Sequence, residues 1–149
     1  MESELRDITI IGFIGLGVMG EPMCSHLSRR GGKRVLAYDL KREPLERLAR
    51  DGVIATEPTE IARQCDVILL SLPDGRAVQS VIAELEPALS AGCCVVDTST
   101  SPVALTRAIG ARLAARDIAF ADAPVARTRE AAARGALSIM VGATDAVFA

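Results

Sequence analysis

Apolar and polar positions follow two different patterns along the chain. Short runs that are apolar at nearly every position are bounded by glycine, proline or charged residues. Such runs are typical of strands that are covered on both faces of a parallel sheet. The predicted strands cover residues 7–14, 34–38, 66–71, 93–96 and 118–121.

Longer stretches lie between these runs and carry apolar residues at helical spacing, with arginine and glutamate on the other face. The predicted helices cover residues 18–30, 43–50, 57–63, 76–89 and 102–116. Strands that alternate with amphipathic helices predict repeated β-α units, because each crossover helix returns the chain to a parallel strand. We therefore expect an α/β fold around a central parallel sheet.

The last part of the chain predicts a short helix at 131–134, a late strand at 136–141 and the opening of another helix at 145–149. No Ser/Gly-rich linker, low-complexity tract or internal repeat divides the sequence. We expect one domain over residues 1–149. Because the sequence stops inside a predicted element, we also expect the natural chain to continue.

Composition excludes several classes of protein. Half of the 149 residues are apolar and 24% are charged, which is typical of a folded chain. A net charge of −2 and the absence of tryptophan argue against nucleic-acid binding. The longest uncharged run, 8–20, is too short for a membrane span. The first seven residues do not resemble a secretory signal, so we expect a cytoplasmic protein.

The positions of the cysteines and of the histidine do not predict a metal or redox site. The four cysteines include an adjacent pair but no C-x-x-C, so we expect reduced core residues. The single histidine, His26, has no second metal ligand or catalytic partner at a characteristic spacing, and we expect a structural role for it.

A glycine motif follows the first predicted strand and opens the first predicted helix. It is formed by Gly15, Leu16, Gly17, Val18, Met19 and Gly20. The first glycine permits a tight turn, the second lets the backbone approach a diphosphate, and the third lets helix and strand pack closely. The free N–H groups at the helix N-terminus would then bind phosphates. Three glycines alone are also compatible with a turn that serves packing only.

Asp39 stands at the end of the second predicted strand. A dinucleotide-binding fold places there the carboxylate that binds the adenosine ribose, and together with the glycines it predicts a Rossmann-type, doubly wound sheet. Taken alone, Asp39 could instead cap the next turn. A carboxylate favours NAD over NADP, although Lys41 and Arg42 could bind a 2′-phosphate.

Two further segments end predicted strands, where ligands bind in open α/β sheets. One is Leu72-Pro73-Asp74, and the other is the hydroxyl-rich segment 97–102. Serine and threonine before a proline also cap many helices, and spacing alone does not separate this role from ligand binding.

The chain resembles the β-hydroxyacid dehydrogenase family, which includes 3-hydroxyisobutyrate dehydrogenases and sulfolactaldehyde reductases. The resemblance covers nearly everything after residue 7 and rests on four ordered motifs: 12–20, Leu72-Pro73, 97–100, and 122–125 followed by 135–137 and 140–142. It implies that the first segment holds the cofactor. By position it implies nucleotide contacts for Val18, Met19, Asp39, Leu72, Pro73 and Thr100, and a substrate contact for Ser99.

Two departures from the family pattern bear on the substrate and on catalysis. The family sequence Ser-Gly-Gly after Asp-Ala-Pro-Val is replaced by Ala126, Arg127 and Thr128. Arg127 and Thr128 resemble the pair found in sulfolactaldehyde reductases and predict binding of a terminal anion such as a carboxylate, phosphate or sulfonate. The alternative is a solvated helix start formed with Arg129, Glu130 and Arg134. The family's catalytic lysine has no counterpart in Lys33 or Lys41, and we expect it beyond residue 149.

The resemblance implies an oxidoreductase that transfers a hydride between NAD and a short β-hydroxy acid or its semialdehyde. The helical second domain of the family would be absent from this chain, and the whole enzyme would be a homo-oligomer. Two alternatives remain: a nucleotide-binding sensor or interaction module without catalysis, and a related imine reductase. Fold alone does not exclude them.

Overall fold

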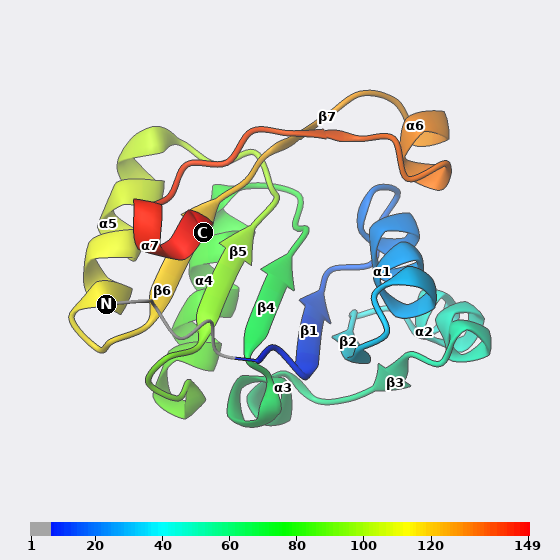
Figure 1. Ribbon diagram of the computed structural model, residues 1–149, viewed down its shortest axis with the longest axis horizontal. Coiled ribbons are helices and arrows are strands. Elements are labelled where there is room, and N and C mark those ends of the chain that lie inside the picture. Colours follow the sequence, from blue (N-terminus) through cyan, green and yellow to red (C-terminus); the bar gives the residue numbers. More distant parts are fainter. Residues whose placement is uncertain (1–6) are drawn as a thin grey trace.

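A six-stranded parallel sheet forms the centre of the protein, with strand order β3-β2-β1-β4-β5-β6. The computed structural model describes residues 7–149. The main strands are β1 (Ile10–Ile14), β2 (Arg34–Tyr38), β3 (Ile54–Ala55), β4 (Val67–Leu70), β5 (Cys94–Asp97) and β6 (Ala119–Asp122). The order reverses between β1 and β4, which are direct neighbours (Figure 1). The predicted Rossmann-type, doubly wound fold is therefore confirmed.

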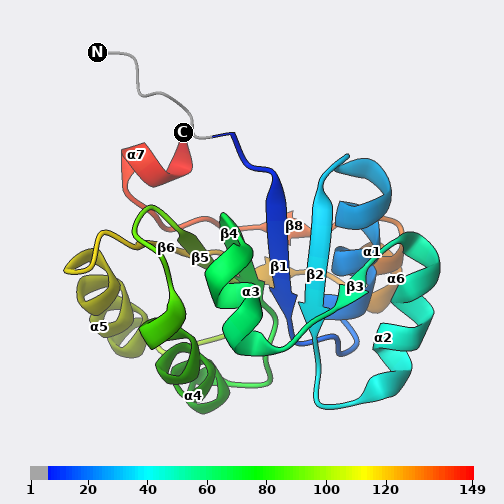
Figure 2. The same cartoon turned by 90° about the horizontal axis from the view of Figure 1, so that it is seen from below.

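Helices cover both faces of the sheet (Figure 2). They are α1 (Gly20–Arg30), α2 (Arg42–Leu48), α3 (Pro58–Gln64), α4 (Gly75–Leu85) and α5 (Val103–Ala114), with short 3-10 turns η1 (Ala49–Asp51) and η2 (Glu86–Ala88). Side chains of α1 and α2 share one buried cluster, and those of α3, α4 and α5 share the other. The two clusters lie on opposite faces because successive side chains of a strand alternate. In β1, Phe13 belongs to the first cluster and Ile14 to the second.

Several predicted boundaries need correction. The predicted strand 7–14 begins only at Ile10, and the predicted helix 18–30 begins only at Gly20, because residues 15–19 form the turn between them. The predicted helix 76–89 ends as an α-helix at Leu85 and continues as η2 around Pro87, whose ring cannot continue an α-helix.

The late strand predicted at 136–141 is reduced to β8 (Ser138–Ile139) and does not join the main sheet. It pairs antiparallel with β7 (Val125–Ala126), which the sequence did not predict. Between them lies α6 (Arg129–Ala133), and α7 (Asp145–Phe148) follows. The β7–β8 pair lies above the arrowheads of the central strands, and α6 packs against α1 (Figure 1). We call residues 125–139 the strap.

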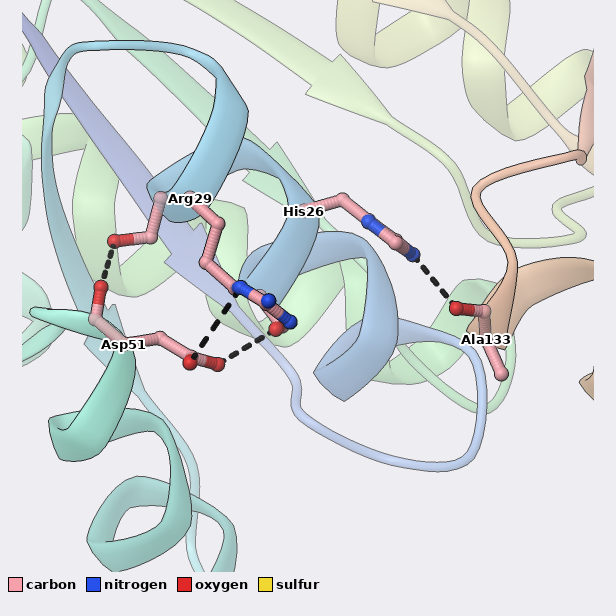
Figure 3. Close-up of polar contacts among 6 residues, drawn as sticks. His26, Arg29, Asp51 and Ala133 are labelled. Carbon is pink, nitrogen blue, oxygen red and sulfur yellow. Dashed lines mark hydrogen bonds and ion pairs between the residues drawn. The ribbon is translucent and has the colours of Figure 1, made fainter.

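One polar contact ties the strap to α1. His26 Nε2 lies 2.9 Å from the carbonyl oxygen of Ala133 (Figure 3). Ala131 and Ala132 are buried at the same junction. The other side of α1 is bound to η1, where Ser25 donates to Asp51 Oδ2 at 2.6 Å and Ser28 to the Asp51 carbonyl at 2.7 Å. His26 thus has the structural role predicted for it.

The remaining general predictions concern the termini and the thiols. Residues 1–6, on which the absence of a secretory signal was argued, lie outside the described part. From residue 7 onward, no helix is both long and apolar enough to cross a membrane. Of the four cysteines, Cys24, Cys65 and Cys93 are buried and Cys94 is half-buried.

Candidate functional site

A cavity of about 700 Å³ opens at the carboxyl ends of β1, β2 and β4. It is formed by the glycine turn, the end of β2, the loop after β4 and one face of α4. Of the predicted cofactor residues it contains Gly15, Gly17, Val18, Met19, Asp39, Leu72 and Pro73. The strand order reverses at this edge, which is where open α/β sheets bind ligands.

The three glycines of the turn have different roles. Gly15 has a φ of +94°, and a Cβ there would collide with the carbonyl of Ser71. A Cβ on Gly20 would collide with the carbonyl of Gly15, so helix and turn pack too closely for a side chain. A Cβ on Gly17 would meet nothing within 4 Å. Packing therefore explains Gly15 and Gly20, whereas Gly17 leaves its backbone open toward the cavity.

Asp39 is anchored from both sides by backbone amides. The Leu16 N–H donates to Oδ2 at 2.7 Å, and the Lys41 N–H donates to Oδ1 at 2.8 Å. The second bond is the turn cap considered from the sequence, but the first joins the end of β2 to the glycine turn. Each oxygen keeps acceptor capacity. Asp39 lines the cavity, so this capacity suits two neighbouring hydroxyls of a ribose.

The face of α4 is the part of the cavity that sequence reasoning missed. Asp74 caps this helix by accepting from the Ala77 N–H at 2.9 Å. Beyond the cap, the lining residues are Ala77, Ser80, Val81 and Glu84. They recur at spacings of three and four, which is one face of a helix. Leu72-Pro73 before the helix could have pointed to this face, because the loop directs the helix N-terminus to the same edge.

A buried network joins the loops after β4 and β5. Asp97 is 0% exposed and accepts from the Ser99 N–H and from the Ser101 hydroxyl, both at 2.9 Å. Ser99 in turn accepts the Leu72 N–H on Oγ at 2.8 Å. The N-cap of α5 is Pro102 and has no side-chain cap, so capping does not explain these hydroxyls. They hold the two loops together.

A second carboxylate lies beside Asp97. Asp122 is its direct register partner on β6. Burial, and then the charge of Asp97, raise the pKa of Asp122. The carboxyl group of Asp122 therefore holds its proton more tightly than a solvated carboxyl group does. This pair was not predicted from the sequence, because neither residue alone signals burial.

The other predicted site residues lie outside the cavity. Thr100 is exposed, and neither it nor Ser99, Arg127 or Thr128 lines the 700 Å³ cavity. Thr128 Oγ1 caps α6 by accepting from the Ala131 N–H at 3.2 Å. Arg127 is exposed and has a φ of +100°, so it retains a backbone conformation that favours glycine. Gly20 packs beneath the turn, and Leu16 contributes its amide while its side chain is buried.

Burial raises the pKa of Cys24 and that of Cys65 to about 12, so both thiols stay protonated near neutral pH. Over residues 7–149, no group of three or more His, Cys, Asp or Glu side chains could hold a metal ion.

An open glycine backbone, a ribose-type carboxylate and the position at the strand reversal together define a dinucleotide-binding domain. Residues 10–149 match the family described as the NAD binding domain of 6-phosphogluconate dehydrogenase. The chain belongs to this family and represents the NAD-binding domain of the β-hydroxyacid dehydrogenases. The resemblance drawn from its motifs is confirmed.

Two curated relatives are similar over almost the whole chain. One is the 2-(hydroxymethyl)glutarate dehydrogenase of Eubacterium barkeri, 37% identical, with 99% of this chain and 49% of that protein covered. The other is the 3-sulfolactaldehyde reductase of Escherichia coli, 33% identical, with 90% and 46% covered. The chain thus spans about half the length of these relatives.

Solved structures show the same coverage. The 3-hydroxyisobutyrate dehydrogenase of Mycobacterium tuberculosis, determined with L-serine, is 29% identical with a TM-score of 0.89, covering 95% of this chain and 49% of that one. Psf3, determined with NADP+ and 2-OPP, is 27% identical with a TM-score of 0.83, covering 93% and 50%.

Proposed function

We propose that this chain binds NAD(H) for an oxidoreductase that acts on a short β-hydroxy acid or its semialdehyde. The observation that carries the proposal is the cavity in which the open backbone of Gly17 and the anchored carboxylate of Asp39 share one wall. Residues 1–149 would form one domain of that enzyme, which we expect in the cytoplasm as a homo-oligomer.

In this function the glycine turn, 15–20, holds the diphosphate with backbone N–H groups, and the first turn of α1 adds its positive dipole end. Asp39 accepts the hydroxyls of the adenosine ribose. Leu72 and Pro73 form the apolar wall. Thr100, which lies outside this cavity, is assigned a contact to the ribose side of the bound cofactor by its position in the family motif. The bound nicotinamide supplies the hydride.

NAD fits the site better than NADP. A carboxylate at Asp39 accepts ribose hydroxyls but repels a 2′-phosphate. Lys41 lies on the adjoining turn and Arg42 is the first residue of α2, and both are exposed. Two exposed cations contribute little against a carboxylate anchored by two amides. The NADP+ complex of Psf3 shows that a related fold also takes NADP+, so this preference depends on the residues of this chain.

The substrate would bind on the β5 and β6 side of the same edge. We assign Ser99, Arg127 and Thr128 to it. The positive charge of Arg127 suits a carboxylate, phosphate or sulfonate, because its planar fork binds such groups through two hydrogen bonds. Similarity to the 3-sulfolactaldehyde reductase makes a sulfonate a specific candidate. Thr128 can donate its hydroxyl proton while its oxygen caps α6.

Proton transfer would require a residue outside this chain. The lysines are Lys33, just before β2, and Lys41, beside the ribose carboxylate, and neither reaches the substrate side. We therefore propose that the catalytic lysine belongs to a part of the enzyme beyond residue 149. The 149-residue chain is expected to bind cofactor without turnover. A sensor without catalysis is less well supported, since it would not need the substrate-side segments.

The experiment has two arms. The 149-residue protein is titrated with NADH by fluorescence, and saturable binding is expected. Incubated instead with NAD+ and added β-hydroxy acids, the same protein is expected to form no NADH. The whole-length protein is then assayed with NAD+ and short carboxylates, phosphates and sulfonates. Absence of NADH binding would refute the cofactor assignment. Binding without turnover on any substrate in the whole-length protein would favour the sensor.

A further inference from the structure

A second cavity adjoins the first on the far side of Asp39. It measures about 490 Å³ and shares Gly17, Val18, Asp39 and Lys41 with the larger cavity. Its other walls are the start of α1 and the first two turns of α2. A group attached to a ribose at Asp39 therefore has space on this side of the carboxylate.

The side chains of this cavity carry both signs of charge, but its arginine is already paired. Arg47 Nε donates to Glu21 Oε1 at 2.6 Å, and its terminal nitrogen donates to Oε2 at 2.8 Å. This is the two-pronged geometry in which guanidinium and carboxylate match best. The hydrogen bond that Arg47 donates to Glu21 raises the pKa of Arg47 above its ordinary value.

The Glu21–Arg47 ion pair occupies the guanidinium group that would otherwise bind a phosphate. A guanidinium binds a phosphate oxygen pair through the same fork that Glu21 occupies. Without Arg47, the cavity presents Lys41 against the carboxylates of Asp39 and Glu43. Its free charge is then negative, which opposes a phosphate dianion.

We propose that Glu21 is a specificity-determining residue: by occupying Arg47, it makes the second cavity unfit for a phosphate monoester on the ribose of the bound dinucleotide. The inference rests on the proposed binding of NAD(H). It adds a determinant on α1 and α2 to the one at Asp39. This determinant could not be predicted from the sequence, because Glu21 and Arg47 meet only when α1 and α2 pack together.

The test compares three variants with the unmodified protein. Glu21→Gln keeps the size of the side chain and releases Arg47 from its ion pair. Glu21→Gln combined with Arg47→Gln removes the released cation as well. Glu46→Gln is the matched control, because it removes one negative charge from exposed α2 without lining the cavity. Dissociation constants for NADH and for NADPH are measured by fluorescence titration, and folding is checked by circular dichroism.

Glu21→Gln is expected to shift the NADPH to NADH affinity ratio toward NADPH about tenfold, the scale of one charge-assisted contact. The double variant and Glu46→Gln are expected to stay within about twofold of the unmodified ratio. If NADH binds and the ratio of Glu21→Gln is unchanged, or if the double variant shifts as much as Glu21→Gln, the role of Glu21 is overturned while cofactor binding stands. If neither nucleotide binds the unmodified protein, the proposed function falls and this inference with it.

Discussion

Gly17 and Gly20 separate the packing role of the glycine turn from its binding role. A Cβ added at Gly17 would meet nothing within 4 Å, and Gly17 does not have a positive φ. The change Gly17→Ala should therefore leave the fold intact. It should even raise the free energy of unfolding by about 0.5 kcal/mol, because alanine restricts the unfolded chain.

The same methyl group should weaken cofactor binding. It would stand on the open side of the backbone, where the diphosphate must approach the N–H groups. Loss of one hydrogen bond to a charged group costs about 2 kcal/mol, which corresponds to roughly thirtyfold in the dissociation constant.

Gly20→Ala is the matched counterpart. The added Cβ would collide with the carbonyl of Gly15, a backbone atom that cannot rotate away. Overpacking of this kind costs about 3 kcal/mol. In a domain of this size that lowers the melting temperature by roughly 6–12 °C.

Thermal unfolding by circular dichroism and NADH titration by fluorescence measure both effects. Gly17→Ala should keep its melting temperature and lose affinity, whereas Gly20→Ala should lose melting temperature. An NADH dissociation constant unchanged by Gly17→Ala would refute the placement of the diphosphate. A fully stable Gly20→Ala would refute the packing argument.

Four further variants test the part of the site that lies beside β5 and β6. Asp97→Ala should lower the free energy of unfolding by about 3 kcal/mol in urea denaturation, since two hydrogen bonds to a buried carboxylate are lost; a loss under about 1 kcal/mol would contradict the network. The pKa of Asp122 is raised from 3.8, so the folded state holds its proton longer than the unfolded state, and the carboxylate costs stability as pH rises above about 3.8. Asp122→Asn should therefore gain stability over the unmodified protein with rising pH. A flat difference between pH 3 and 7 would contradict the raised pKa of Asp122, which burial and then the charge of Asp97 cause. Arg127→Gly should raise the free energy of unfolding by about 1 kcal/mol, because it relieves a φ of +100°. In the whole-length enzyme, Arg127→Ala should lower kcat/KM by an amount equivalent to about 2–4 kcal/mol of transition-state stabilisation, with NADH affinity nearly unchanged. Unchanged kcat/KM on every anionic substrate would show that Arg127 does not bind the substrate.

The sequence predicted the sheet well where long apolar runs carry the signal. The apolar run that ends at Ile14 and the run 66–71 became the buried centre of the sheet. By contrast, β3 consists of two exposed residues, Ile54 and Ala55, whose pairing depends on β2 alone. So short an element leaves no periodic pattern, and only the assembled sheet reveals it.

The cofactor half of the site was predictable because its residues are consecutive or end a strand. Glycines 15, 17 and 20 and Asp39 needed only local rules, and the structure brings them to one cavity. The anchoring of Asp39 by the Leu16 amide was not predictable, since it joins two β-α units. For the same reason the partner of Ser99 Oγ, the Leu72 amide, could not be read from a single segment.

The most direct test of the central claim is an NMR titration of the ¹⁵N-labelled protein with NADH. If the dinucleotide lies in the proposed cavity, the amide signals of Leu16, Gly17, Val18 and Lys41 should shift in a saturable way. The amide signals at the amino ends of the strands, such as those of Asp66 and Cys94, should not shift. Saturable shifts confined to the amino ends of the strands, or no shifts in a folded protein at millimolar NADH, would contradict the assignment of this chain as a site for NAD(H).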